Sequence, residues 1–153
     1  MSKVGVFFGT GYEEIEALAV VDLLRRENIE TEMISVTGEM TVTGSHGIAV
    51  CMDKLIEEAC FDSLDVIVLP GGMSGTKKLE ACDELMKQVD AFVEKGKKVC
   101  AICAAPSILG HRGHLNGKKA TAYPGFENQL SGAEVLCVPA VTDANGVAKF
   151  NLE

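Results

Sequence analysis

The stretch KVCAICAAP, residues 98–106, indicates most directly how this chain folds and where its chemistry lies. A short apolar run, typical of a buried strand, ends at Cys103, and small residues lead through Pro106 into an apolar stretch typical of a helix. A strand, a sharp turn and a helix form a nucleophile elbow, in which the turn lifts one side chain clear of the sheet. The new helix points its positive end at the sulfur, and this favours thiolate over thiol. We therefore predict that Cys103 is a nucleophile.

Length and charge exclude several classes of protein. The chain has 153 residues, which suits one domain with a sizeable core, and its net charge of −8 repels phosphate backbones. We therefore expect no nucleic-acid partner. No apolar run approaches the roughly 20 residues that span a bilayer. Residues 1–4 lead straight into a strand without a signal peptide, so we expect a cytoplasmic protein with no membrane partner.

The six cysteines predict free thiols, because a disulfide framework belongs to small secreted chains with thin cores. The apolar surroundings of Cys51, Cys100 and Cys137 suggest core packing for these three. Cys100 and Cys103 have C-x-x-C spacing, but a redox motif requires a helix N-terminus between its cysteines, and here Cys100 lies inside the expected strand. A zinc site requires a second pair at ligand spacing, which the sequence lacks. We expect no metal and no cofactor.

Apolar runs alternate with helical patterns along the chain. Continuous apolar strands separated by helices predict an α/β fold, a doubly wound and mostly parallel sheet sandwiched by helices in a flavodoxin-like arrangement of three layers. The expected strands cover residues 3–8, 32–36, 65–69, 99–102, 119–122 and 134–138, with a hairpin over 40–43 and 47–52. The expected helices cover residues 13–27, 54–60 and 82–95, besides the one that follows the elbow.

Topology predicts the position of a site. Ligands of such folds bind beyond the carboxyl ends of the strands, and three loops fall there: residues 9–16, 70–75 and 103–106. The first loop brings carboxylates, the second brings glycine N–H groups and the third brings the thiol. We therefore expect these three loops to converge.

Four segments carry a resemblance to a known family. They are GYEEIE with DLLRR (residues 11–16 and 22–26), DVIVLPGG (65–72), AICAAP (101–106) and GKKATAYPGFE (117–127). In these segments the chain resembles the ThiJ/PfpI superfamily, and more narrowly the branch of the Parkinson's-disease-linked protein deglycase and bacterial YajL. The match covers nearly the whole chain in order, so we expect one such domain over residues 1–153.

The resemblance assigns roles to four residues. Cys103 is the nucleophile and the oxidation-sensitive thiol, and Glu16 is a protonated carboxyl that donates a hydrogen bond to its sulfur. A carboxyl buried beside a thiolate has a raised pKa, and the neutral acid can then donate. The backbone N–H groups of Gly72 and Ala104 form an anion pocket for a substrate oxyanion or for the oxygen of an oxidised sulfur.

Helix phase from the sequence separates Glu16 only weakly from its neighbours, and the resemblance decides the choice. Glu13 and Glu14 are also acids in the first turn, where carboxylates usually serve as solvated partners of the helix dipole. If Ile15 and residues 18–19 mark the buried stripe of the helix, Glu16 alone points inward. We therefore expect Glu13 and Glu14 to be solvated.

Three more residues are placed at the periphery of the site. Tyr123 occupies a position where many members of the family have a histidine, and a tyrosine is a poor base at neutral pH. His46 and Arg26 correspond to basic positions that bind oxygen anions near the dimer interface of relatives, or they are ordinary surface charges. Ala104 stands where the protease-like branch has a histidine, which disfavours peptidase chemistry.

Three functions follow as alternatives. The first is a cofactor-free glyoxalase or deglycase, in which Cys103 attacks a small aldehyde such as methylglyoxal or a glycated thiol or amine. The second is an oxidative-stress sensor and redox-regulated chaperone that responds through oxidation of Cys103. The third, thiazole monophosphate biosynthesis, comes from the name of many relatives, and the sequence shows no phosphate loop or basic cluster that supports it.

The end of the chain departs from the family pattern. Family members continue into a long closing helix, whereas this sequence ends at residue 153, so we expect that helix to be missing. Its absence predicts an exposed apolar patch or a partner on one face of the sheet. We also expect a homodimer formed through the first helix, around residues 22–26.

Overall fold

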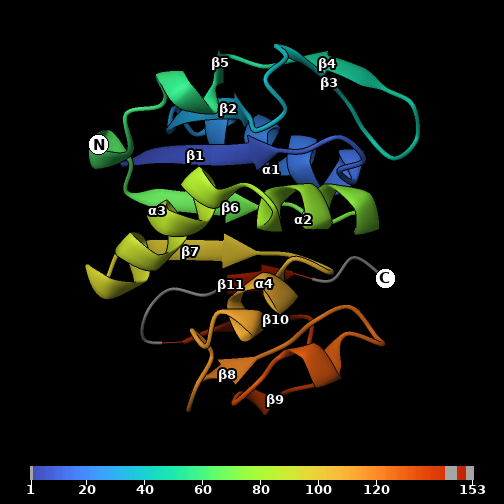
Figure 1. Ribbon diagram of the computed structural model, residues 1–153, viewed down its shortest axis with the longest axis vertical. Coiled ribbons are helices and arrows are strands. Elements are labelled where there is room, and N and C mark those ends of the chain that lie inside the picture. Colours follow the sequence, from blue (N-terminus) through green and yellow to red (C-terminus); the bar gives the residue numbers. More distant parts are fainter. Residues whose placement is uncertain (1, 144–147, 151–153) are drawn as a thin grey trace.

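The computed structural model describes residues 2–143 and 148–150. Its centre is a five-stranded sheet in the order β5-β2-β1-β6-β7, and every neighbouring pair is parallel (Figure 1). The strands are β1 (Lys3–Phe8), β2 (Glu30–Ser35), β5 (Lys54–Leu55), β6 (Val66–Leu69) and β7 (Lys98–Ala101). The doubly wound α/β fold expected from the sequence is confirmed.

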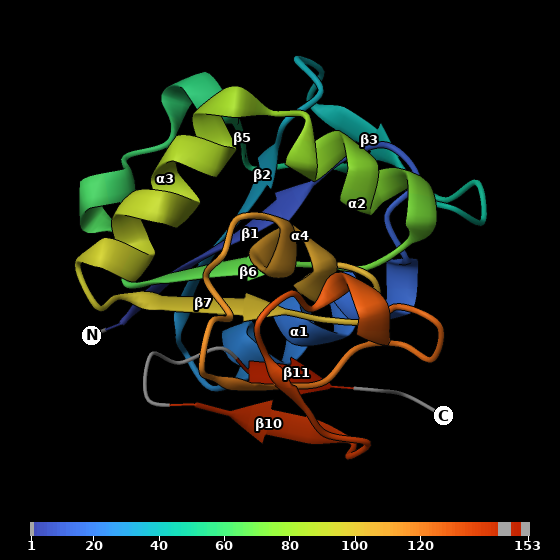
Figure 2. The ribbon, with the colours of Figure 1, turned by 60° about the horizontal axis from the view of Figure 1, so that its bottom comes forward.

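Helices cover both faces of the sheet. Figures 1 and 2 show α1 on one side and α2, α3 and α4 on the other. These helices are α1 (Glu14–Arg26), α2 (Met73–Glu80), α3 (Asp83–Glu94) and α4 (Pro106–His111). None of the described helices is long and apolar enough to cross a membrane.

The alternation of residues along β1 explains the two cores. Val4, Val6 and Phe8 belong to the core on the α1 side, whereas Phe7 packs into the core that α2, α3 and α4 share. Successive side chains of a strand point to opposite faces, and both faces of this sheet are covered, so the strand is apolar from residue 4 to its end.

Smaller elements surround this centre. The strands β3 (Thr41–Thr43) and β4 (Ala49–Cys51) form the expected hairpin. After α4 come β8 (Lys119–Ala120), paired with β9 (Glu134–Val135), and then the antiparallel pair β10 (Ala140–Thr142) and β11 (Ala148–Phe150). Short 3-10 helices cover Ile56–Glu58, Phe61–Ser63 and Glu127–Gln129.

Residues 54–60 do not form the predicted helix. Leu55 pairs with Ser35, so the backbone first enters the sheet as β5. The following turn is a 3-10 helix of three residues, closed by a 2.8 Å hydrogen bond from the Leu55 N–H to the Glu58 carboxylate. The pairing with β2 therefore replaces the first turn of the expected helix.

The cysteines differ from the prediction in their burial. All six are free thiols, as expected, and Cys100 is partly buried and packs against the core on the α1 side, but Cys51 and Cys137 are exposed. Cys51 lies on the hairpin outside the main sheet, and Cys137 follows the short strand β9. Apolar neighbours in sequence do not ensure burial when the segment lies at the rim of the fold.

The α1 side of the sheet is partly open beside β6 and β7. An apolar groove of about 450 Å³ lies there, and Val66, Val68 and Cys100 form part of its lining. The prediction that the closing helix is missing concerns the end of the chain. Residues 151–153 lie outside the described residues.

Candidate active site

The three loops expected to converge do so through backbone hydrogen bonds. The Glu13 N–H donates to the Gly71 carbonyl at 3.0 Å, and the Gly75 N–H donates to the Gly11 carbonyl at 3.1 Å. These bonds join the loop after β1 to the loop after β6. The elbow after β7 joins them at Gly71, where an added Cβ would lie 2.6 Å from the Cβ of Cys103. The carboxyl ends of β1, β6 and β7 therefore meet at one place.

Cys103 has the backbone conformation of a nucleophile elbow. Its φ of 63° lies in the left-handed region, which residues other than glycine seldom adopt. β7 ends two residues earlier, and α4 begins with Pro106 at its first position. Such strain is typical of functional sites, where the surrounding structure holds one side chain in a required direction. Here that side chain is the thiol.

Three groups surround the sulfur. The N–H groups of Gly72 and Ala104 donate hydrogen bonds to it, and the Glu16 side chain is its third hydrogen-bond partner. Gly71 makes this approach possible, because an added Cβ would overlap the Glu16 carboxylate. The structure thus brings Cys103, Glu16, Gly72 and Ala104 together. Glycines after a strand are common in turns, so the sequence pattern alone does not single out Gly71.

Burial and the Glu16 carboxylate act against the thiolate that the helix dipole favours. Burial, the charge of the Glu16 carboxylate and the hydrogen bond to it raise the pKa of Cys103 to about 11, and the Ala104 and Gly72 N–H groups act in the opposite direction. With Glu16 ionised, the thiol therefore keeps its proton at neutral pH and donates it toward the carboxylate. Cys103 and Glu16 share one proton, and reaction at the sulfur requires that proton to move.

Glu14 is buried rather than solvated, which corrects the sequence-based expectation. It is 4% exposed. Its carboxylate accepts hydrogen bonds from the backbone N–H of His46 at 2.8 Å and from the Ser45 hydroxyl at 3.1 Å, and His46 Nδ1 lies 3.0 Å away. Burial alone raises the pKa of Glu14, but these bonds outweigh it and lower the pKa to about 2. Glu14 therefore anchors the β3–β4 hairpin to the start of α1.

This anchor makes a testable contribution to stability. Glu14 and Glu13 raise the pKa of His46 above its ordinary value of 6.5. The folded state therefore holds the His46 proton more tightly than the unfolded state, so the stabilisation is complete below pH 6.5 and is lost as pH rises through the raised pKa. We expect His46→Asn to lower the urea midpoint most on the acid side of neutrality and least in alkaline buffer. A difference that grows with pH would contradict this account.

The peripheral residues lie at different distances from the sulfur. The backbone N–H of Tyr123 donates to the carbonyl of Cys103 at 2.9 Å, and its side chain is half exposed. His46 is linked to the site through Glu14, two residues before Glu16. Arg26 follows Glu16 by ten residues on α1, which corresponds to about 15 Å along the helix, and it pairs with Asp22. Within one chain, Arg26 lies away from the thiol.

One group of side chains has the donor atoms of a metal site. Ligand atoms of Glu13, Glu14 and His46 lie within 4.8 Å of one another. The hydrogen bonds of Ser45 and His46 to Glu14 already account for this arrangement. We therefore assign the group to the anchoring of the hairpin.

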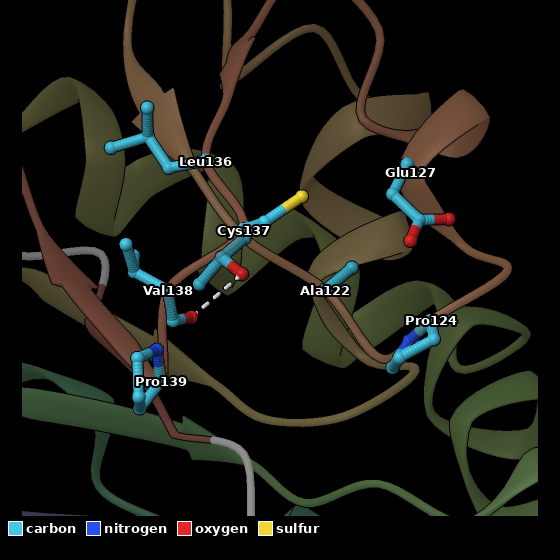
Figure 3. A pocket seen from close by; sticks show the side chains of 8 residues that line it. Ala122, Pro124, Glu127, Leu136, Cys137, Val138 and Pro139 are labelled. Atoms are coloured by element: carbon cyan, nitrogen blue, oxygen red, sulfur yellow. Dashed lines mark hydrogen bonds between the residues drawn. The ribbon is translucent and has the colours of Figure 1, made fainter.

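A separate pocket lies beyond the elbow, on the segment that follows β8. It has a volume of about 270 Å³, and Figure 3 shows the Cys137 sulfur and the Glu127 carboxylate extending toward it from different walls. The hydroxyl of Thr121 donates to the Val138 carbonyl at 3.1 Å and so closes one side. None of the predicted site residues lines this pocket. The reactive groups that the fold brings together are those around Cys103.

Comparison with protein-family models gives a match to the DJ-1/PfpI family over residues 2–148. The chain is 35% identical to "Protein DJ-1 homolog A" of Arabidopsis thaliana over 134 residues, which are 87% of this chain and 34% of that protein. It is 30% identical to "Deglycase PfpI" of Pyrococcus furiosus over 139 residues, which are 90% of this chain and 82% of that protein. The chain spans about a third of the length of the Arabidopsis relatives.

Solved structures show the same fold. Drosophila melanogaster DJ-1beta superposes with a TM-score of 0.91 at 29% identity, covering 98% of this chain and 82% of that one. Oxidised Toxoplasma gondii DJ-1 superposes with a TM-score of 0.90 at 32% identity, with the same coverage of both chains.

Proposed function

Because this chain belongs to the DJ-1/PfpI family, we propose that it is a cofactor-free, cysteine-dependent enzyme of the glyoxalase or deglycase type. Its substrates are methylglyoxal-like 2-oxoaldehydes or their adducts with thiols and amines. The observation that carries this proposal is the strained Cys103, whose sulfur lies against two backbone N–H groups and the Glu16 carboxyl. Relatives named deglycases, at 30–31% identity, support the substrate class.

The arrangement suggests a first step. The thiol of Cys103 attacks the aldehyde carbon, and Glu16 accepts the thiol proton as the carbon–sulfur bond forms. The N–H groups of Gly72 and Ala104 stabilise the oxyanion, which becomes the hydroxyl of a hemithioacetal. The raised pKa of Cys103 makes this proton transfer part of the attack rather than a step before it.

The remaining steps need no added oxidant. Glu16 removes the proton on the former aldehyde carbon while the neighbouring carbonyl oxygen takes up a proton, which gives an enediol. The hydroxyl on the first carbon then loses its proton and the second carbon gains one from Glu16, so that the first carbon is oxidised and the second is reduced. The product is a 2-hydroxyacyl thioester of Cys103. Water then releases the 2-hydroxy acid and restores the thiol. Methylglyoxal and water thus give lactate, and formation of lactate without added thiol or cofactor tests the proposal.

A homodimer is a further part of this proposal. Ile15 and Leu23 of α1 are 64% and 62% exposed, which is unusual for large apolar side chains on a helix that also packs on a sheet. This exposure supports the expectation that α1 contributes to a dimer interface.

Redox sensing by Cys103 is a second candidate, because the two N–H groups at the sulfur suit the oxygen of an oxidised thiol. The pKa values oppose it. Hydrogen bonds from Ser63 lower the pKa of the exposed Cys60, whereas that of Cys103 is raised. Peroxide attacks thiolates, so we expect substoichiometric peroxide to modify Cys60 before Cys103. Peptide mass spectrometry checks this order, and selective oxidation of Cys103 would favour the sensor.

A further inference from the structure

A groove of about 280 Å³ runs between α2 and α4, and its geometry follows from helix periodicity. Met73, Thr76, Lys77 and Glu80 line it from α2, at the spacing of one helical face. Ala104, Ser107 and His111 line the opposite wall, and Phe126 and Gln129 complete the lining.

Two residues that line this groove directly follow residues of the candidate site in the sequence. Met73 directly follows Gly72, and Ala104 directly follows Cys103. Adjacent Cα atoms are about 3.8 Å apart, so one end of the groove begins one residue from the nucleophile and from each N–H donor of the anion pocket. Met73 is 61% exposed, so it offers an apolar surface at this end of the groove.

The other part of the groove is lined by one lysine and one glutamate, and they differ in their partners. Within residues 2–143 and 148–150, no carboxylate lies within salt-bridge distance of Lys77, which follows Met73 by one helical turn. Glu80, the acid in the groove, is paired with His111, whose Nδ1 lies 2.6 Å from its carboxylate. His111 Nε2 in turn lies 3.2 Å from the Gln129 side-chain oxygen. Lys77 is therefore the group that remains to bind an anion.

We propose that this groove binds the carrier part of an adduct, an amino acid or short peptide with a free carboxylate that pairs with Lys77. This deepens the proposed function and rests on it. Methylglyoxal has three carbon atoms and fills little of a groove of about 280 Å³. Met73 and Lys77 are about 6 Å apart along the helix axis, which matches the distance from a reacting carbon to a carboxylate a few bonds away.

The test uses electrophiles that alkylate Cys103, so it measures binding in the groove without requiring the enzyme to turn over a substrate. N-iodoacetyl-β-alanine and its primary amide alkylate cysteine by displacing iodide, and they differ only in the terminal carboxylate. We expect the carboxylate reagent to label Cys103 roughly threefold faster than the amide, when each rate is divided by that of the exposed Cys60 in the same sample. Peptide mass spectrometry gives both rates.

Variants of two adjacent lysines distinguish an ion pair between Lys77 and the carboxylate of the reagent from the electrostatic field of the whole protein. Lys77→Ala should remove the preference and Lys77→Glu should reverse it. Lys78→Ala removes the same charge outside the groove lining and should keep it. Equal rates in the wild type, an equal loss in both alanine variants, or no labelling of Cys103 would overturn the proposal. If the wild type converts no methylglyoxal but Cys103 still reacts faster with the carboxylate reagent, the result contradicts the proposed function alone.

Discussion

Replacing Glu16 with Gln is expected to change two properties of Cys103 in opposite directions. The Glu16 carboxylate raises the pKa of the thiol by its charge and its hydrogen bond, so its removal lowers that pKa. More thiolate is then present at neutral pH, and alkylation of Cys103 by iodoacetamide becomes faster, by roughly tenfold for each unit by which the pKa falls. Turnover of methylglyoxal falls by about 10²–10⁴-fold, because an amide neither accepts nor releases a proton at neutral pH and so cannot act as the acid or base.

The pH profile of alkylation gives the same prediction a second measurement. In the wild type, the alkylation rate of Cys103 should still be rising above pH 9.0, the ordinary pKa of the thiol, toward about 11. In Glu16→Gln the rise should come at lower pH. Glu27→Gln removes one exposed carboxylate at the other end of α1 and serves as the matched control. Slower alkylation in Glu16→Gln, or unchanged turnover, would contradict the role assigned to Glu16.

The sheet and the elbow were predictable because their signals are local. Residues 4–8 and 66–69 are continuous apolar runs, as a strand covered on both faces requires, and both lie in central strands. Residues 98–106 show the strand, the turn and the proline of the elbow, and the structure gives Cys103 the expected strained turn. These predictions needed no contact between distant parts of the chain.

The helix α2 was missed for the opposite reason. Its first half contains Ser74, Gly75 and Thr76, which are poor helix formers, so the sequence pattern predicts a loop over residues 70–75. Gly75 is required by packing, since an added Cβ would lie 2.7 Å from the backbone of Tyr12. Tertiary contact with the first loop therefore outweighs local preference. The groove beside Cys103 could not be predicted without this helix.

The environment of the carboxylates was equally beyond local patterns. Glu14 is buried because the tip of the β3–β4 hairpin, more than 30 residues later, folds over it. Glu16 was selected from the resemblance, and the sequence pattern alone did not separate it from Glu13 and Glu14. The raised pKa of Cys103 depends on burial and on one carboxylate, which are properties of the assembled site.

Replacing Cys103 with Ser is expected to reduce lactate formation to the uncatalysed background, which is the largest effect that the account predicts. A serine hydroxyl is a much weaker nucleophile than a thiol, and no other group in the proposed mechanism forms the covalent intermediate. Cys100→Ser is the matched control, because it makes the same change on the same segment, three residues earlier, where the thiol lines the apolar groove. It should keep turnover near that of the wild type.

The most direct test is therefore the conversion of methylglyoxal to lactate by the wild type, Cys100→Ser and Cys103→Ser, without added thiol or cofactor. The first two proteins should form lactate, and the third should form none above the uncatalysed background. Equal lactate formation by Cys103→Ser, or none by the folded wild type, would contradict the proposed function.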